Sequence, residues 1–341
     1  MSRRRSQRCR WNSRSVIMKA EVLTSSKKAP TTLMPRMFAT RVPATFPAPL
    51  TPGPWVEELV GAPFVPHPIE GMTRTIAEGK SASLVTVQLA QARGMGALQF
   101  EQATVAAYQA IRSSLATLRH CHPVRFWNYI PAIHEPMDAR RDRYMVFNAG
   151  RFSAFSDWFD GPAPSTEHLP AASGVGHDGD DLVIHCLAFE QPGEAIENPR
   201  QIPAFQYSAR YGPRPPCFAR ATLAPDPNGD GLLLLAAGTA SIRGEQTLHP
   251  ADLQGQLDET ITNLRALLTA AERSAEPDDL NAFTDLCVYH LRAEDAPLLG
   301  EKIRAIFGPA MRLQMHRADI CRADLLVEIE GVARLHRKRN R

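Results

Sequence analysis

The stretch "CRADLLVEIEG", residues 321–331, places two carboxylates and a thiol close together in the sequence. Because side chains alternate along a strand, Glu328 and Glu330 share one face, and the other face is aliphatic. The carboxylates could belong to a solvated sheet face, or one of them could lie in an apolar pocket. Burial raises the pKa of a carboxylic acid, so a buried Glu328 could donate a proton near neutral pH.

Cys321 lies seven residues before Glu328, across an Arg-Ala-Asp turn. If the turn joins adjacent strands, the thiol can face the carboxyl group. A buried cysteine with a purely structural role is the simpler alternative.

Residues 197–216, "ENPRQIPAFQYSARYGPRPP", form a long, polar connection that contains Tyr207, Arg210 and Tyr211, and Arg220 follows on the next strand. A connection of this length is usually functional or disordered. Arginine matches a carboxylate with two parallel N–H donors, and tyrosine offers a flat apolar ring with a hydroxyl group. The segment therefore suits a cyclic ligand with more than one carboxylate, and a surface loop with unrelated cations is the alternative.

The histidines and cysteines show no metal-binding pattern. The sequence contains no CxxC, HExxH or P-loop motif, and "GVGHDG", residues 174–179, is interpreted as a turn rather than a dinucleotide-binding loop, so we expect neither a metal ion nor a cofactor. The six cysteines are scattered, and most lie in apolar runs, which favours reduced thiols and a cytoplasmic location.

The charge is unevenly distributed along the 341 residues. Residues 1–41 hold 11 of the 39 Lys and Arg residues and one of the 36 acids, so the rest carries a net charge of −7. An acidic body argues against nucleic-acid binding, and no apolar run is long enough to span a membrane. The basic N-terminus could be a disordered arm, a targeting segment or an over-extended start, and the Pro-rich stretch after it could bind a partner.

The hydrophobic pattern predicts two α+β units. Residues 38–70 are irregular by their proline content, and order begins near residue 80. The first unit has strands at 81–92, 124–133 and 180–190 and helices at 96–120 and 143–159, whereas "SGVGHDGDD" is interpreted as a turn. The second has a hairpin at 215–242, helices at 249–272 and 296–308, and strands at 285–291, 311–321 and 325–335.

This order predicts an internal repeat of architecture, with mixed sheets that are covered by helices on one face. The expected division is a disordered tail at 1–50, an N-terminal unit at 51–196, the connection at 197–216 and a C-terminal catalytic unit at 217–335.

Several longer strings resemble the chorismatase family, in its hydroxybenzoate-forming branch. They are "RFWNYIP", "RYMVFNAGR", "ASGVG", "ENPRQIPAFQYSARYGPRPPCFARAT", "GTASIRGE" and "LLVEIEG", and the similarity spans about residues 80–331. The resemblance implies two units of the YjgF/RidA-like (chorismate mutase-like) fold. Family members often carry a pteridine-dependent dioxygenase-like label, which nothing in these residues supports.

The resemblance also implies roles for particular residues. Glu328 corresponds to the catalytic proton donor, and Cys321 to a cysteine of the hydroxybenzoate-forming branch. Substrate-binding positions follow from the Arg/Tyr segment and the "GTAS" strand: Tyr207, Arg210, Tyr211, Arg220 and Ala240.

The implied activity is cofactor-independent conversion of chorismate to pyruvate and 3-hydroxybenzoate, with 4-hydroxybenzoate as a second candidate product. A hydrolase that forms a dihydroxycyclohexadiene carboxylate is one alternative. A non-catalytic RidA-like protein that binds a small carboxylate and an enamine deaminase are others. Either a monomer or a trimer is compatible with two fused units.

Overall fold

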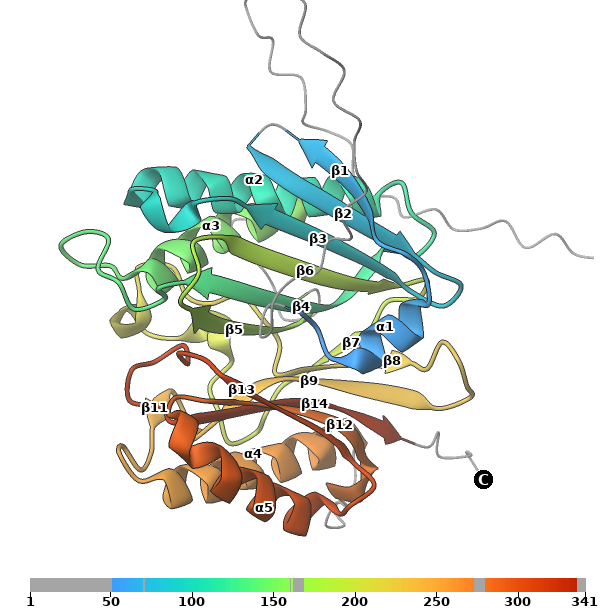
Figure 1. The fold of residues 1–341 in the computed structure, drawn as a ribbon, viewed down its shortest axis with the longest axis vertical. Helices are drawn as coiled ribbons and strands as arrows, with labels where there is room; N and C mark the ends of the chain where they lie inside the picture. The colour runs from blue at the N-terminus through green and yellow to red at the C-terminus, as the bar shows by residue number, and fades with distance from the viewer. Residues whose placement is uncertain (1–50, 70, 160, 162–168, 273–279, 336–341) are drawn as a thin grey trace, which may run out of the picture.

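The computed structural model describes residues 51–335, apart from 70, 160, 162–168 and 273–279. The predicted disordered tail, residues 1–50, lies outside the described residues. The chain forms four layers, in which two six-stranded mixed sheets face each other between two layers of helices (Figure 1). The predicted α+β architecture, with helices on one face of each sheet, is confirmed.

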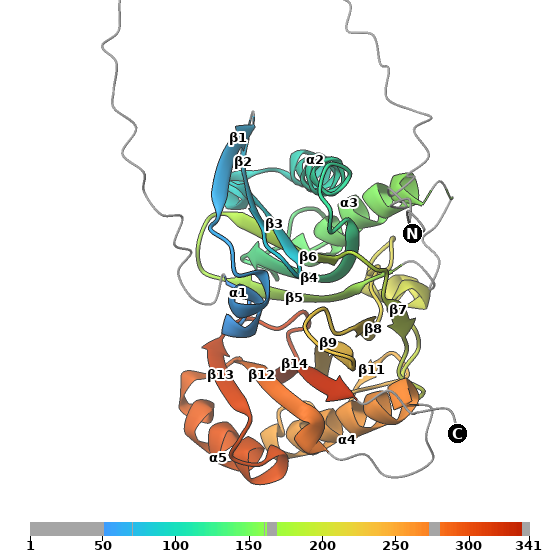
Figure 2. The ribbon, with the colours of Figure 1, turned by 90° about the vertical axis from the view of Figure 1, so that its right-hand side faces the viewer.

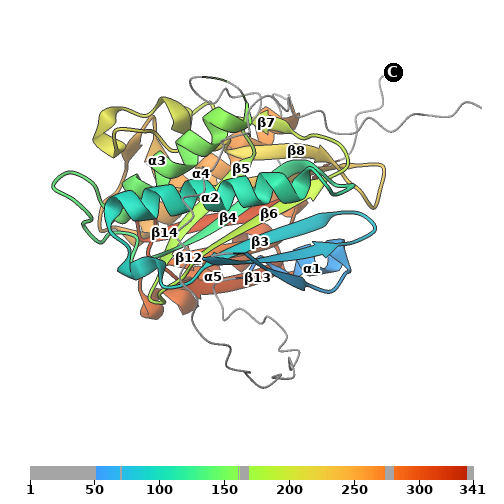
Figure 3. The same ribbon diagram turned by 90° about the horizontal axis from the view of Figure 1, so that it is seen from above.

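The N-terminal unit contains the first sheet. Its elements are α1 (Pro54–Val60), β1 (Val65–Ile69), β2 (Met72–Glu78), β3 (Ser83–Leu89), α2 (Ala97–Leu115), β4 (His122–Pro131), α3 (Arg143–Trp158), β5 (Ala171–His177) and β6 (Leu182–Phe189). The strand order is β1-β2-β3-β6-β4-β5, and β4 runs parallel to β5. Helices α2 and α3 cover the outer face of this sheet (Figure 3).

The C-terminal unit contains the second sheet. Its elements are β7 (Glu194–Ile196), β8 (Ala221–Pro225), β9 (Leu232–Ala240), the short strands β10 (Ile242–Arg243) and β11 (Gln246–Thr247), α4 (Leu253–Glu272), β12 (Phe283–His290), α5 (Ala296–Phe307), β13 (Arg312–Arg317) and β14 (Val327–Leu335). The strand order is β13-β12-β14-β9-β8-β7, and β12 runs parallel to β13. Helices α4 and α5 cover the outer face of this sheet (Figure 2).

The two sheets share one topology. In each, the last strand of the unit is inserted between the third and the fourth, and a helix links the parallel pair. The repeat of architecture predicted from the element order is therefore present.

Three apolar layers hold the structure together: one beneath α2 and α3, one beneath α4 and α5, and one between the sheets. Because β6 lies in the first layer on one face and in the inter-sheet layer on the other, all eight of its residues are buried. A strand covered on both faces reads as a continuous apolar run, as "LVIHCLAF" does. No helix in the described ranges has the length and apolarity that a membrane span requires.

Ordered structure begins earlier than the sequence indicates. We expected an irregular chain up to about residue 80, but α1, β1 and β2 lie before that point. The prolines Pro66 and Pro68 suggested a loop, and they are tolerated because β1 is an edge strand. The strand β7 also comes before the connection, and it pairs with β8 in the second sheet.

The segment "SGVGHDGDD" was wrongly interpreted as a turn, because its first five residues belong to β5. Glycine is rare in strands, which is why the pattern misled. Here the glycines permit close packing. A β-carbon on Gly176 would collide with the side chain of Ile133, and one on Gly174 would lie 3.3 Å from the ring of Tyr144.

Candidate active site

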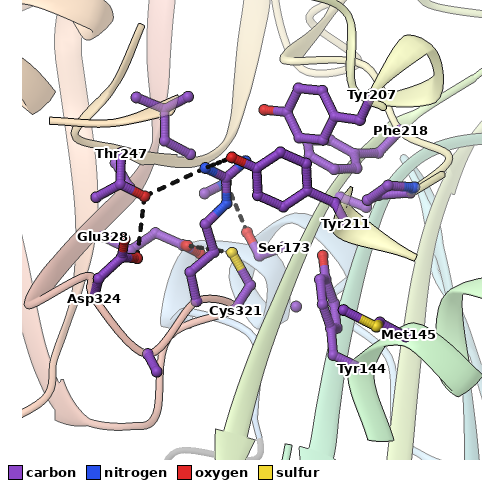
Figure 4. Close-up of a pocket in the computed structure, with 18 of the residues that line it drawn as sticks. Tyr144, Met145, Ser173, Tyr207, Tyr211, Phe218, Thr247, Cys321, Asp324 and Glu328 are labelled. Atoms are coloured by element: carbon purple, nitrogen blue, oxygen red, sulfur yellow. Dashed lines mark hydrogen bonds between the residues drawn. The ribbon is translucent and has the colours of Figure 1, made fainter. Parts of the chain in front are cut away.

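A cavity of about 380 Å³ lies between the two units, a size suited to a small organic ligand. Its walls come from α3, β5, β9, the β10–β11 hairpin, the 197–216 connection and the loop before β14 (Figure 4). All seven residues singled out from the sequence line it: Tyr207, Arg210, Tyr211, Arg220, Ala240, Cys321 and Glu328. The cavity contains parts of both units, so neither unit forms it alone.

Glu328 lies on β14, on the face that points toward the first sheet, and only 3% of its surface is exposed. Burial, aided by the Glu330 carboxylate, raises the pKa of Glu328 to about 8 against the opposing effect of Arg125 and Arg220. Glu328 therefore carries its proton at neutral pH and can act as an acid.

The neighbouring strand leaves space for this carboxyl group. Glu328 pairs with Ala240 of β9, and an irregularity in the register places Gly238 directly against it. A β-carbon on Gly238 would collide with Oε1 of Glu328. The carboxyl group of Glu328 can therefore occupy this position only because residue 238 has no side chain.

Cys321 is adjacent to the acid, as the sequence suggested. Its Sγ lies 4.0 Å from Oε2 of Glu328 (Figure 4). Burial, together with the nearby Glu328, raises the pKa of the thiol to about 12, so Cys321 is a neutral thiol rather than a thiolate. A neutral thiol packs as a small apolar group beside the acid.

The Arg/Tyr connection forms one wall of the cavity. Tyr207 directly follows one short 3-10 helix, and Tyr211 is the last residue of another. The centres of their two rings lie 5.2 Å apart (Figure 4). Arg220 on the chain just before β8 donates to the hydroxyl of Tyr207 at 2.6 Å. Arg210 is exposed at the edge of the cavity, with its guanidinium carbon 5.6 Å from the ring centre of Tyr211.

Two arginines that sequence reasoning missed also line the cavity. Arg322 stacks 4.0 Å from the ring centre of Tyr211 and donates to the backbone oxygen of Glu245. Arg151 on α3 is buried and donates to the side chain of Asn148. Arg151 could have been found, because it lies on the apolar face of the predicted helix, four residues from both Phe147 and Phe155.

These guanidinium groups retain hydrogen-bonding capacity. Nε of Arg151, Nε of Arg220 and Nη2 of Arg322 are buried without a hydrogen-bond partner among the described residues. All three residues line the cavity, so their positive charges lie where an anionic ligand would bind. Arginine in such a place suits a carboxylate.

Arg200 is not part of the site, although it belongs to the same connection. It pairs with Glu259 of α4 at 2.6 Å and donates to Asn263. Other lining groups come from both units: His134, Asp142, Tyr144, Met145, Ser173, Phe218, Thr247 and Asp324. Within the described ranges, no group of three or more His, Cys, Asp or Glu side chains is arranged to hold a metal ion.

Comparison with known proteins agrees with this geometry. Residues 68–188 match the family profile described as chorismatase FkbO/Hyg5-like, N-terminal. The chain is 36% identical to the 3-hydroxybenzoate synthase of Streptomyces hygroscopicus over 241 residues, which cover 69% of this chain and 70% of that protein. The chain belongs to the chorismatase family.

Further matches extend over most of the chorismatase fold. A chorismatase of Streptomyces rapamycinicus is 32% identical over 241 residues, again 69% of this chain and 70% of that protein. The crystal structure of a chorismatase, 28% identical, covers 79% of this chain and 78% of its own with a TM-score of 0.67. The family predicted from strings such as "RFWNYIP" and "LLVEIEG" is confirmed.

Proposed function

We propose that the protein converts chorismate to 3-hydroxybenzoate and pyruvate without a cofactor. Glu328 carries the proposal, because it is a buried acid, protonated at neutral pH, in the wall of a cavity that Arg151, Arg220 and Arg322 also line. The similarity of the chain to a 3-hydroxybenzoate synthase supports 3-hydroxybenzoate as the product.

The charges of the cavity match those of chorismate, which has one carboxylate on its ring and one on its enolpyruvyl ether. Arg151 comes from the N-terminal unit, and Arg220 and Arg322 come from the C-terminal unit. Guanidinium groups from opposite units can therefore bind the two carboxylates separately. The rings of Tyr144, Tyr207 and Tyr211 supply flat surfaces for the cyclohexadiene ring.

The reaction needs one proton donor. Glu328 transfers its proton to the methylene carbon of the enol ether, which creates an oxocarbenium-like centre. This weakens the bond between the ether oxygen and the ring carbon that carries it. The newly formed Glu328 carboxylate stabilises that positive charge. The ether oxygen leaves with pyruvate, and the oxygen of the neighbouring ring hydroxyl bonds to the vacated ring carbon while the hydroxyl proton returns to Glu328. The bond from this oxygen to its original carbon then breaks, and the ring aromatises as the proton on the newly oxygenated carbon is transferred to the oxygen, which gives 3-hydroxybenzoate. Loss of a ring proton with the hydroxyl group left in place would give 4-hydroxybenzoate instead. All atoms of chorismate are recovered in the two products.

Cys321 is proposed to favour formation of hydroxybenzoate over hydrolysis of chorismate. Because its thiol is neutral and lies against Glu328, it acts as an apolar wall that limits access of water to the reacting centre. The hydrolase alternative differs in its product, since hydrolysis adds a water molecule. Mass analysis of the products distinguishes hydroxybenzoate, of either isomer, from the dihydroxycyclohexadiene carboxylate.

The test is incubation of the purified protein with chorismate, followed by chromatography of the aromatic products and a pyruvate assay. We expect Glu328→Gln to lower kcat by about 10²–10⁴-fold, the usual contribution of a positioned acid. Glu259→Gln is the matched control, because Glu259 pairs with Arg200 away from the cavity. Pyruvate release by E328Q at the wild-type rate would refute the assignment of the acid.

Two broader expectations remain proposals. A cytoplasmic location is proposed from the scattered cysteines of the sequence; the thiols of Cys186, Cys217, Cys287 and Cys321 are free, whereas Cys121 is disulfide-bonded. A monomer and a trimer remain the two candidate assemblies, and light scattering of the purified protein distinguishes them.

A further inference from the structure

The proposed reaction gives no role to the buried carboxyl group of Glu330. Glu330 is on the same face of β14 as Glu328, one strand repeat (roughly 7 Å) further along. It is 5% exposed and accepts hydrogen bonds from three strands. Nη2 of Arg125 and Nε1 of Trp127 each donate at 2.8 Å, and the hydroxyl of Tyr289 donates at 3.3 Å.

Ser173 supplies a fourth donor and links this network to the cavity. Its Oγ accepts from Nη2 of Arg125 at 2.5 Å and from the backbone N–H of Gly238 at 2.9 Å. Both acceptor positions of the hydroxyl group are then occupied, so its single proton is donated to Glu330. Glu330 thus accepts hydrogen bonds from four donors, one of them the guanidinium group of Arg125, an arrangement that suits a carboxylate.

The same contacts fix the strand beneath the acid. Ser173 lies on β5 and holds the backbone of Gly238 on β9, which is the residue against which the Glu328 carboxyl group rests. Glu330 in turn anchors Ser173. The network therefore connects strands of both units at the position of Glu328.

We propose that Glu330 is a positioning residue, whose carboxylate keeps Glu328 protonated and holds Gly238 beneath it through Ser173. This inference rests on the proposed function, in which Glu328 must carry a proton. Glu330 acts on the acid by charge repulsion and by fixing the strand, and it does not touch the substrate.

The charges around the pair support this role. The titratable groups that face Glu328 or Glu330 from the surrounding elements are Arg125, Tyr129, Tyr144, Arg220, Cys287, Tyr289, His316 and Cys321. Burial lowers the pKa of His316 and favours its neutral form. Arg125 and Arg220 then favour ionised Glu328, while Glu330 opposes them.

The test compares pH profiles of kcat/KM for chorismate. In the wild type, activity falls as the pH rises through the pKa of Glu328, about 8. Glu330→Gln removes the repulsion and leaves Arg125 unopposed, so this fall should move to lower pH by at least about one unit, with at least about fivefold loss at pH 8 and recovery on acidification. Arg125→Gln removes the attraction, so the fall should move to higher pH.

Opposite shifts distinguish an electrostatic role from a loss of structure, and circular dichroism checks the fold of each variant. If Glu330→Gln does not fold, the upward shift of Arg125→Gln decides the question. Glu259→Gln makes the same substitution in another ion pair and should leave the profile unchanged. Unchanged profiles in both variants, or shifts in the same direction, would overturn the proposal.

A second measurement separates this inference from the proposed function. The infrared band of the protonated Glu328 carboxyl group, assigned by its loss in Glu328→Gln, can be titrated without substrate. Its midpoint should fall in Glu330→Gln whether or not chorismate reacts. If chorismate is not converted but the midpoint moves, the proposed function fails and the coupling stands; if it is converted and the midpoint is constant, the coupling fails.

Discussion

At the scale of single residues, two glutamates on one strand face lie in different surroundings. Their local sequences are nearly alike, and the difference comes from distant parts of the chain. Arg125, which is 205 residues away, pairs with Glu330, whereas Glu328 faces the cavity. Alternation along the strand predicts a shared face for the two residues but cannot say which one carries the proton.

The raised pKa of Glu328 predicts how stability depends on pH. A carboxyl group whose pKa rises on folding binds its proton more tightly in the folded state. Its contribution to the free energy of unfolding is therefore full below the ordinary pKa of 4.5 and is lost as the pH approaches about 8. The wild type should lose stability relative to Glu328→Gln over this range, by roughly 4 kcal/mol at most.

Urea denaturation of both proteins at about pH 5 and about pH 8 measures this difference. The comparison cancels the contributions of the other titrating groups. A parallel pH dependence in the two proteins would mean that Glu328 has an ordinary pKa in the folded state.

At the scale of elements, the strongly periodic helices and apolar strands were predictable. The helix at 249–272 was expected from its leucine stripe, and α4 buries Leu257, Leu264 and Leu268 as that stripe requires. The site segments on β14 and in the connection were also predictable, because unusual residue types cluster there within short distances of sequence.

The elements that were missed share a physical reason. The prolines of β1 and the glycines of β5 are unfavourable in isolated strands, and tertiary contacts reverse the preference. Arg151 and Ser173 reach the cavity from elements that lie far in the sequence from its other walls. Their function depends on which strands and helices pack together, which periodicity does not specify.

The register of β9 makes a sharp prediction for Gly238→Ala. The added β-carbon collides with Oε1 of Glu328, so the carboxyl group must move out of place. Because β9 is paired on both sides, the strand cannot shift away. We expect kcat for chorismate to fall by at least about tenfold while the protein remains folded, consistent with the cost of misplacing a reacting group.

Gly300→Ala is the matched control, because a β-carbon there meets no atom within 4 Å. Steady-state kinetics and circular dichroism of both variants provide the comparison. Full activity in Gly238→Ala would show that the acid tolerates another position.

At the scale of the whole molecule, the two units depend on each other. The layer between the sheets buries apolar residues from both, among them Trp127, Leu233 and Tyr289. The ion pair of Arg125 and Glu330 crosses the same interface. The division into units at 51–196 and 217–335 with a connection between them remains a prediction about domains, and the interface argues that these parts fold together.

We therefore expect a chain that ends at residue 196 to be unstable by itself. It would expose one whole face of the first sheet and leave Arg125 buried without its partner, and a patch of this size promotes aggregation. Size-exclusion chromatography and binding of a hydrophobic dye measure this, with the full chain as the control. A monomeric fragment with a cooperative unfolding transition would contradict the expectation.

The shared strand order of the two sheets has an evolutionary consequence. When two identical subunits pair through the same surface, every substitution at the interface appears twice. A cation on one side and an anion on the other, as in Arg125 and Glu330, can be optimised independently only after the two copies are joined in one gene. Fusion of a duplicated ancestor would thus have allowed the C-terminal unit to evolve the acid Glu328 while the N-terminal unit evolved residues that hold it in position.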